Sequence, residues 1–324
     1  MKKVFLSLVL VLIMAVGAAA VTLPFTEPSP IQCDGNNACE TKGDLTVRGD
    51  TSVTGCIANA NPAPNYKSMA DLLNVFDDAG ASCSLLLGFL NVGAGNTEIN
   101  QCNTTAGYAT YCNAVAGACP VDSLWTSADQ ETVGQSYVLD FDGVNDMIAI
   151  PDNTAFTLDG NFTIGFMLSL DAVATDQTFI FSKAGAGAAE YFIRVPNSST
   201  KIDLWVRDIS ADAFALVTLS YNLTPNQLYF VVFTHDEAVG SGATWSTGTE
   251  IYIDTVEDTG LIRTTEAGFV DMEDLGGNFN IGANYSGSVP TAMKMAKLFI
   301  LKGTALSQAQ INRVNLIMRA NVCQ

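Results

Sequence analysis

The sequence predicts an all-β protein whose C-terminal part folds as an antiparallel sandwich or jelly roll. Between residues 135 and 316, short strand-like runs recur, and turn-forming Gly, Pro, Asn or Asp residues separate them. Only one segment of this region has helical periodicity, so strands do not alternate with helices as they do in an α/β fold. Hydrophobic residues make up 48% of the 324 residues and charged residues 15%, a composition that excludes a disordered chain.

Residues 1–20 have the pattern of a secretory signal peptide. A basic start at residues 1–3 is followed by the apolar run 4–16 and by three alanines at 18–20. The apolar run is shorter than the roughly 20 residues that a spanning helix requires, so an uncleaved anchor is the less favoured alternative. No second run of spanning length follows. We therefore expect no membrane insertion after cleavage, and a secreted, extracellular or cell-surface protein.

The number of cysteines is consistent with a secreted protein. An even number of cysteines behind a signal peptide indicates disulfides, although the sequence does not define their pairing. Seven lie before residue 120, so if all of them pair within the chain, one bridge joins the last cysteine to the N-terminal part. A zinc site is disfavoured because the chain has no Cys-x-x-Cys and a single histidine. The eight cysteines are Cys33, Cys39, Cys56, Cys83, Cys102, Cys112, Cys119 and Cys323.

The composition changes near residue 130. Residues 21–130 are predicted to form a small disulfide-rich segment of undefined fold, and residues 131–324 the jelly roll. Within the first segment, apolar residues at helical spacing predict a helix over 66–79. The alternating stretch 43–55 resembles the repeating units of fibrous stalk proteins.

The expected strands of the jelly roll are separated by short connections. The last element is a helix over 307–318, since Ser307 and Gln310 form a capping-box pattern before an apolar face. The strands are expected at 136–141, 147–150, 161–170, 178–182, 191–195, 201–208, 213–220, 227–234, 250–254, 278–282 and 294–301.

Seven motifs follow one another in a consistent order along the predicted jelly roll. They are Leu139–Asp146 with Ile150-Pro151, Leu158–Ile164, Thr178–Lys183, Asn226–Thr234, Glu250–Asp254, Phe279–Gly282 and Ala305–Ile311. Together they resemble one family, the laminin G-like jelly rolls of the concanavalin A-like lectin/glucanase superfamily, over residues of about 135–316. The resemblance implies a recognition module for glycans or protein ligands, often supported by calcium.

Four oxygen-bearing side chains surround a glycine turn between the first two strands of this domain. Asp140, Asp142, Asn145 and Asp146 are the hard ligands that calcium prefers, and a family-type calcium site would use some of them. The alternative is that they shape the turn by hydrogen bonds to the backbone.

The stretch 201–208 offers the best candidate ligand surface. Its apolar residues at 202, 204 and 206 alternate inward, which turns Asp203, Trp205 and Arg207 to the other face. An outward tryptophan between charged residues is typical of a sugar-binding surface. Arg194 joins this group if its strand pairs with 201–208 as a hairpin, and Tyr252 also alternates outward. The alternative is that Trp205 packs against the N-terminal segment or a neighbouring subunit.

The sequence does not indicate an enzyme. The carboxylates of Glu250, Asp254 and Glu257 lack the strand spacing that a glycosidase pair requires, and His235 is the only histidine. Glycoside hydrolase activity is therefore the least favoured of the functional hypotheses.

With 33 acidic against 15 basic residues, the net charge of −18 excludes nucleic acid as a partner. We expect non-catalytic recognition of a glycan or glycoprotein at the cell surface, as in adhesion. The alternative is a structural subunit of an extracellular filament, spike or coat, in which case the protein would be a homo-oligomer.

Overall fold

The structure is a computed structural model, and the chain divides into two compact units, residues 1–53 and 54–324. It describes residues 31–33, 39–41, 66–87, 97–99, 102, 108–113, 130–133, 136–144, 146–174, 177–185, 188–284, 286 and 291–319. The signal peptide predicted at 1–20 lies outside these residues, as do Cys56, Cys119, Cys323 and Asn145. In the first unit, strands β1 (Ile31–Cys33) and β2 (Cys39–Thr41) form an antiparallel hairpin in which Cys33 is opposite Cys39.

The elements agree closely with the strands and helices expected from the sequence after residue 135. In chain order they are β1 (Ile31–Cys33), β2 (Cys39–Thr41), α1 (Tyr66–Asp78), β3 (Ser82–Leu87), β4 (Thr97–Ile99), β5 (Tyr108–Asn113), β6 (Gln130–Val133), β7 (Ser136–Asp142), β8 (Asp146–Ile150), the 3-10 helix η1 (Thr154–Phe156), β9 (Phe162–Leu170), β10 (Thr178–Gly185), β11 (Ala188–Val195), β12 (Asp203–Asp208), β13 (Ala213–Thr218), β14 (Tyr229–His235), the 3-10 helix η2 (Gly242–Gly248), β15 (Thr249–Ile253), β16 (Val256–Glu257), β17 (Ile262–Thr265), β18 (Phe279–Ile281), β19 (Ala292–Lys302) and α2 (Gln308–Arg319).

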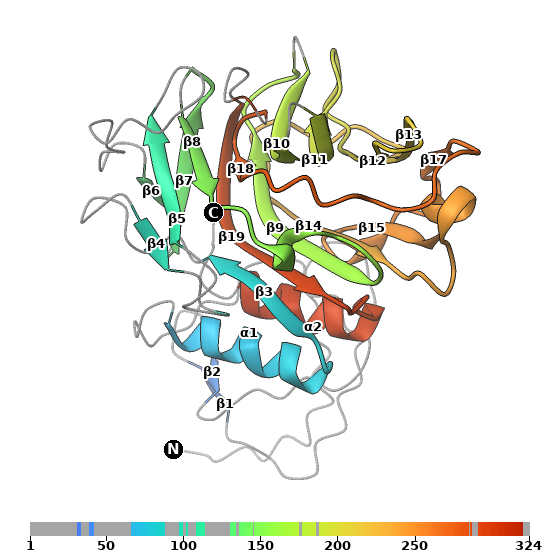
Figure 1. Cartoon of the computed structure of the whole chain (residues 1–324). Coiled ribbons are helices and arrows are strands. Elements are labelled where there is room, and N and C mark those ends of the chain that lie inside the picture. The colour runs from blue at the N-terminus through green and yellow to red at the C-terminus, as the bar shows by residue number, and fades with distance from the viewer. Residues whose placement is uncertain are drawn as a thin grey trace, which may run out of the picture. The chain divides into compact units, whose positions relative to one another are not determined.

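Two antiparallel sheets form the larger unit (Figure 1). One has nine strands in the order β17-β13-β12-β11-β10-β18-β8-β5-β4. The other has eight, in the order β16-β15-β14-β9-β19-β7-β6, with β3 pairing with β19. The all-β sandwich predicted from the sequence is therefore confirmed.

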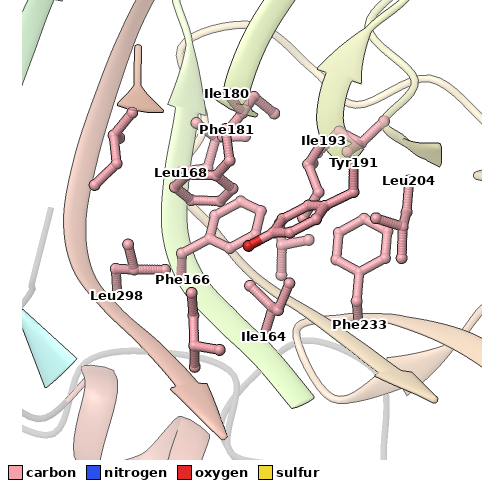
Figure 2. Close-up of a cluster of buried hydrophobic side chains, with 14 of the residues drawn as sticks. Ile164, Phe166, Leu168, Ile180, Phe181, Tyr191, Ile193, Leu204, Phe233 and Leu298 are labelled. Atoms are coloured by element: carbon pink, nitrogen blue, oxygen red, sulfur yellow. The ribbon is translucent and has the colours of Figure 1, made fainter. Parts of the chain in front are cut away.

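The main core lies between the two sheets. Figure 2 shows Phe166 of β9 beside Phe181 of β10, with Tyr191 of β11 and Phe233 of β14 nearby; all four rings are buried. The rings of Phe166 and Phe181 meet edge to face with centroids 4.8 Å apart. Alternate residues of strands from both sheets thus fill a single apolar layer.

A second apolar cluster lies on the other side of the eight-stranded sheet. Helices α1 and α2 lie side by side there (Figure 1) and bury Phe76 and Ile311 against strand residues such as Phe299. The ring of Phe76 is 5.0 Å from that of Phe299. Of the capping box predicted for α2, one half is seen: the side chain of Gln310 accepts hydrogen bonds from the N–H and the hydroxyl of Ser307. The two helices therefore shield part of the outer face of the eight-stranded sheet from solvent.

The sandwich begins earlier in the chain than the sequence indicated. Strand β3 pairs with β19, β5 pairs with β8, and β6 pairs with β7, so strands from the expected N-terminal segment extend both sheets. The expected boundary near residue 130 is therefore not where the structure divides the chain. The pairing of β3 with β19 joins residues far apart in sequence, which local patterns do not record, whereas β6 and β7 are neighbours in the chain.

One disulfide lies within the described part of the chain. It joins Cys83 of β3 to Cys102, whose Cα atoms are 5.4 Å apart. Both side chains pack against the cluster beneath the two helices. The bridge therefore connects β3, which belongs to the eight-stranded sheet, to the chain that follows it. No described helix is long and apolar enough to cross a membrane.

Candidate functional site

A row of four aromatic rings crosses the outer face of the nine-stranded sheet. Phe179, Phe192, Trp205 and Phe214 come from the consecutive strands β10, β11, β12 and β13. The first two rings meet edge to face at 5.3 Å between centroids, and the next two pairs are stacked at 4.5 and 6.0 Å. We call these four residues the aromatic row.

Trp205 faces outward, as the alternation of its strand predicted. Its neighbours Leu204 and Val206 lie in the core between the sheets, whereas Trp205 belongs to the aromatic row. One face of the indole lies on the ring of Phe192, which is nearly parallel to it and only 7% exposed. The indole itself stays partly exposed. Stacking on Phe192 and Phe214 holds the indole in one orientation and leaves only part of it exposed.

The predicted hairpin of β11 and β12 is present and pairs Arg194 with Asp203. The Nε atom of Arg194 lies 3.0 and 3.2 Å from the two carboxylate oxygens of Asp203. Its Nη1 atom donates to the side chain of Gln177 at 2.6 Å. Burial raises the pKa of Asp203 to about 6, although the guanidinium opposes this effect. At neutral pH the pair is therefore charged and closes one side of the aromatic row.

Arg207 flanks the other side of Trp205. Its guanidinium carbon is 6.0 Å from the centroid of the indole, at the outer limit of a cation–π contact. Its Nη2 atom lies 2.6 Å from a carboxylate oxygen of Asp212, in the turn between β12 and β13. Trp205, Arg207, Arg194 and Asp203 are thus brought together, as the sequence indicated, and we call them the Trp205 site.

Tyr252 does not belong to this group, and the expectation that it would be exposed is wrong. It lies in β15 of the other sheet. It points outward from that sheet, but the cluster beneath α1 and α2 buries it to 7% exposure. Its burial depends on helix packing, which strand alternation does not reveal.

Sequence reasoning missed Phe192 and Phe214. The same alternation that placed Trp205 outward would have found them, because Phe192 stands between the inward Tyr191 and Ile193. The sequence does not give the register of the three neighbouring strands, and this register is what aligns the rings of Phe192, Trp205 and Phe214 in one row.

Two of the four predicted calcium ligands, Asp142 and Asp146, bind backbone N–H groups of their own turn. Asp146 accepts a hydrogen bond from the backbone N–H of Asp142 at 2.8 Å, and Asp142 accepts one from the N–H of Val144 at 2.7 Å. Asp140 lies 3.7 Å from Lys294. No group of three or more Asp, Glu, His or Cys side chains suited to a metal ion occurs among the residues that the structure describes. These contacts favour the turn-shaping alternative, and a calcium site stays a prediction.

Two of the three carboxylates weighed for glycoside hydrolysis are engaged in ion pairs. Glu250 lies 2.7 Å from Arg263, and Asp254 pairs with Arg319 of α2. Tyr252 is buried between these two positions of the strand. The arrangement stabilises β15 rather than opening a cleft between two acids.

His235 is part of the core packing. Its ring stacks on Trp245 at 4.4 Å and on Phe162 at 5.3 Å, and its Nδ1 atom is 2.9 Å from the hydroxyl of Thr249. Trp245 itself is buried and anchors η2. Burial lowers the pKa of His235 to about 4.

We expect the protein to lose stability as the pH falls from about 6.5 to 4, in part because of His235. The unfolded chain binds a proton in this range and the folded chain does not, so the free energy of unfolding drops with pH. The contribution is on the order of 3 kcal/mol. Urea unfolding at pH 7 and pH 4.5 measures it, with His235→Phe as the control that lacks the titrating group. Equal losses in parent and variant would contradict the assignment.

Comparisons with known proteins bear on the fold. A family model described as the concanavalin A-like lectin/glucanases superfamily matches residues 142–312. No curated protein matches significantly. Domain 4 of AbnA, a GH43 extracellular arabinanase from Geobacillus stearothermophilus solved with arabinotriose, is 16% identical with a TM-score of 0.49; the match covers 72% of this chain and 98% of that one.

Two binding domains of larger proteins are also similar. The ligand binding domain of botulinum neurotoxin serotype D, solved with N-acetylneuraminic acid, is 13% identical with a TM-score of 0.49, over 76% of this chain and 52% of that one. The binding domain of Paraclostridial Mosquitocidal Protein 1 is 8% identical with a TM-score of 0.51, over 72% and 52%. At this identity the last likeness supports the sandwich fold alone.

Proposed function

The chain belongs to the concanavalin A-like lectin/glucanase superfamily, and from this premise we propose that it is a secreted, non-catalytic recognition protein that binds glycans or glycoproteins at the cell surface. The proposed ligand surface is the outer face of β11, β12 and β13. The observation that carries the proposal is the partly exposed indole of Trp205, which is fixed by Phe192 and flanked by charged side chains.

This chemistry suits a saccharide better than an apolar ligand. Sugar rings pack their C–H faces on aromatic side chains while their hydroxyls seek hydrogen-bonding groups. Trp205 offers the apolar surface, and Arg207 offers donors beside it. Arg194 adds a partly exposed polar group on the same face, whereas its partner Asp203, predicted to face a ligand, is only 2% exposed. The stacked rings leave little conformational freedom to lose on binding, which favours affinity.

Trp205→Ala is expected to weaken glycan binding by about 2 kcal/mol or more, roughly thirtyfold, because a central aromatic anchor is removed. A glycan array, read with and without calcium, identifies the ligand, and titration with that ligand measures the loss. Tyr221→Ala is the matched control, because Tyr221 is an exposed aromatic outside the aromatic row. Its binding should equal that of the parent.

Trp205→Phe separates binding from folding. It keeps a ring on Phe192 and should retain part of the affinity, and thermal unfolding of each variant checks that the sandwich is intact. The proposal fails if the parent binds no glycan under either condition. It also fails if Trp205→Ala binds as the parent does.

A further inference from the structure

Arg207 differs from the other arginine of the Trp205 site in how it is held. Its side chain is 35% exposed, and Asp212, with which it pairs, is 86% exposed. A guanidinium has five N–H donors, and the pair with Asp212 occupies one Nη atom. Ion pairs between such exposed groups contribute little to stability, because water competes for both partners. The pair can therefore open without a large loss.

Arg194, by contrast, is committed to the fold. It binds both oxygens of Asp203, a carboxylate that is only 2% exposed, and its Nη1 atom binds Gln177. Releasing it would leave a buried carboxylate without its cation, which is costly. A ligand anion at this site would therefore meet Arg207 rather than Arg194.

The turn that carries Asp212 is fixed at its base. The carboxylate of Asp208 accepts hydrogen bonds from the N–H groups of Ala211 and Val270, at 2.9 and 3.0 Å, and from the hydroxyl of Ser210 at 2.9 Å. Burial alone would raise the pKa of Asp208, but these hydrogen bonds outweigh it and lower the pKa. The turn therefore holds Asp212 beside Arg207 without making its side chain buried.

We infer that the ligand of the Trp205 site carries a carboxylate, and that this carboxylate binds Arg207 in place of Asp212. The inference rests on the proposed function and specifies its ligand as an acidic saccharide, such as a uronate or a sialate. A guanidinium matches a carboxylate by two parallel hydrogen bonds. The exchange replaces one carboxylate by another, so the local charge balance is kept while the sugar ring packs beside the indole.

Pairs of oligosaccharides that differ only in the carboxylate test the inference. The full-length secreted protein is titrated with uronate- and sialate-terminated oligosaccharides and with their carboxyl-reduced counterparts. The acidic member of a pair should bind at least about tenfold more tightly than the reduced one. Its affinity should also fall with added salt, whereas that of the reduced member should not.

Three variants assign the preference to Arg207. Arg207→Gln should bring the ratio between acidic and reduced ligands close to one while binding of the reduced ligand persists. Asp212→Asn removes the internal competitor and should tighten binding of the acidic ligand severalfold. Trp205→Ala should weaken both ligands alike.

The outcomes separate this inference from the function that it refines. If no oligosaccharide binds, the proposed function and the inference both fail. If acidic and reduced ligands bind equally and Trp205→Ala weakens both, the function stands and the inference is overturned. Weaker acidic-ligand binding by Asp212→Asn would also overturn it, because Asp212 would then be a ligand contact rather than a competitor.

Discussion

Replacing Lys183 by methionine is expected to lower the free energy of unfolding by about 3–5 kcal/mol. The Nζ atom of Lys183 lies 2.5 Å from Glu190, and neither side chain is exposed. It also lies 3.0 Å from Asp274 and 3.1 Å from Asp152, which are partly exposed. Removing the lysine leaves the buried carboxylate of Glu190 without a cation, and this uncompensated charge is the source of the loss.

The pKa shifts follow from the same geometry. Burial alone would lower the pKa of Lys183, but its hydrogen bonds to Glu190 and Asp274 outweigh burial and raise the pKa. In the variant, burial acts on Glu190 without the opposing lysine and raises its pKa further. A carboxyl whose pKa is higher in the folded state binds more protons there. The loss in free energy of unfolding caused by Lys183→Met should therefore become smaller as the pH falls toward the pKa that Glu190 has in the unfolded chain.

Urea unfolding at pH 7 and pH 5 measures both effects. The control combines Lys183→Met with Glu190→Gln, which removes the stranded charge and should recover at least half of the lost stability. A single variant as stable as the parent, or a double variant no better than the single one, would show that this cluster does not hold the sheet as described.

The cluster also fixes a loop that local sequence could not place. The chain at 275–277 approaches the end of β10 so closely that a Cβ atom at Gly277 would overlap the carbonyl oxygen of Ala184. Two glycines therefore permit the approach, one at Gly185 and one at Gly277, and Lys183 holds Asp274 beside them. The sequence of residues 271–277 does not indicate that Asp274 pairs with Lys183, which lies about 90 residues earlier in the chain.

Most of the strands after residue 135 were predictable because their signals are local, although β16 and β17 were not expected. Alternation decided the face of Trp205, and Gly, Pro or Asn turns decided where each strand stopped. Strand β3 lacks both signals, since Leu85–Leu87 is a continuous apolar run whose partner β19 lies about 200 residues away. Its inclusion in the sheet follows from long-range pairing and from burial beneath η1 and α1, which periodicity alone does not encode.

The Trp205 site was predictable in part for the same reason. Alternation within β12 and the hairpin with β11 placed Arg194 and Asp203 beside the indole. The cover over Tyr252 was not predictable, because it comes from the helix layer that packs on this face of the sheet, which strand alternation does not record. An outward position on a strand becomes a ligand surface only when no other element packs on that face.

Phe166→Ala is expected to lower the free energy of unfolding by about 3–5 kcal/mol, because it opens a cavity at the centre of the sandwich. Phe166 is fully buried between the sheets, where its ring meets Phe181 edge to face at 4.8 Å and stacks near Phe233 at 6.4 Å (Figure 2). Phe166→Leu keeps most of the volume and should cost less than half as much.

Phe214→Ala is the matched control for this variant, because Phe214 is a partly exposed phenylalanine on the outer face of the nine-stranded sheet. Removing a ring that water already reaches leaves no closed cavity, so its cost should be well below that of Phe166→Ala. Chemical unfolding of the three variants, followed by both fluorescence and circular dichroism, gives the comparison. If Phe214→Ala lowered the free energy of unfolding as much as Phe166→Ala, the main role of the aromatic row would be to stabilise the fold rather than to bind a ligand.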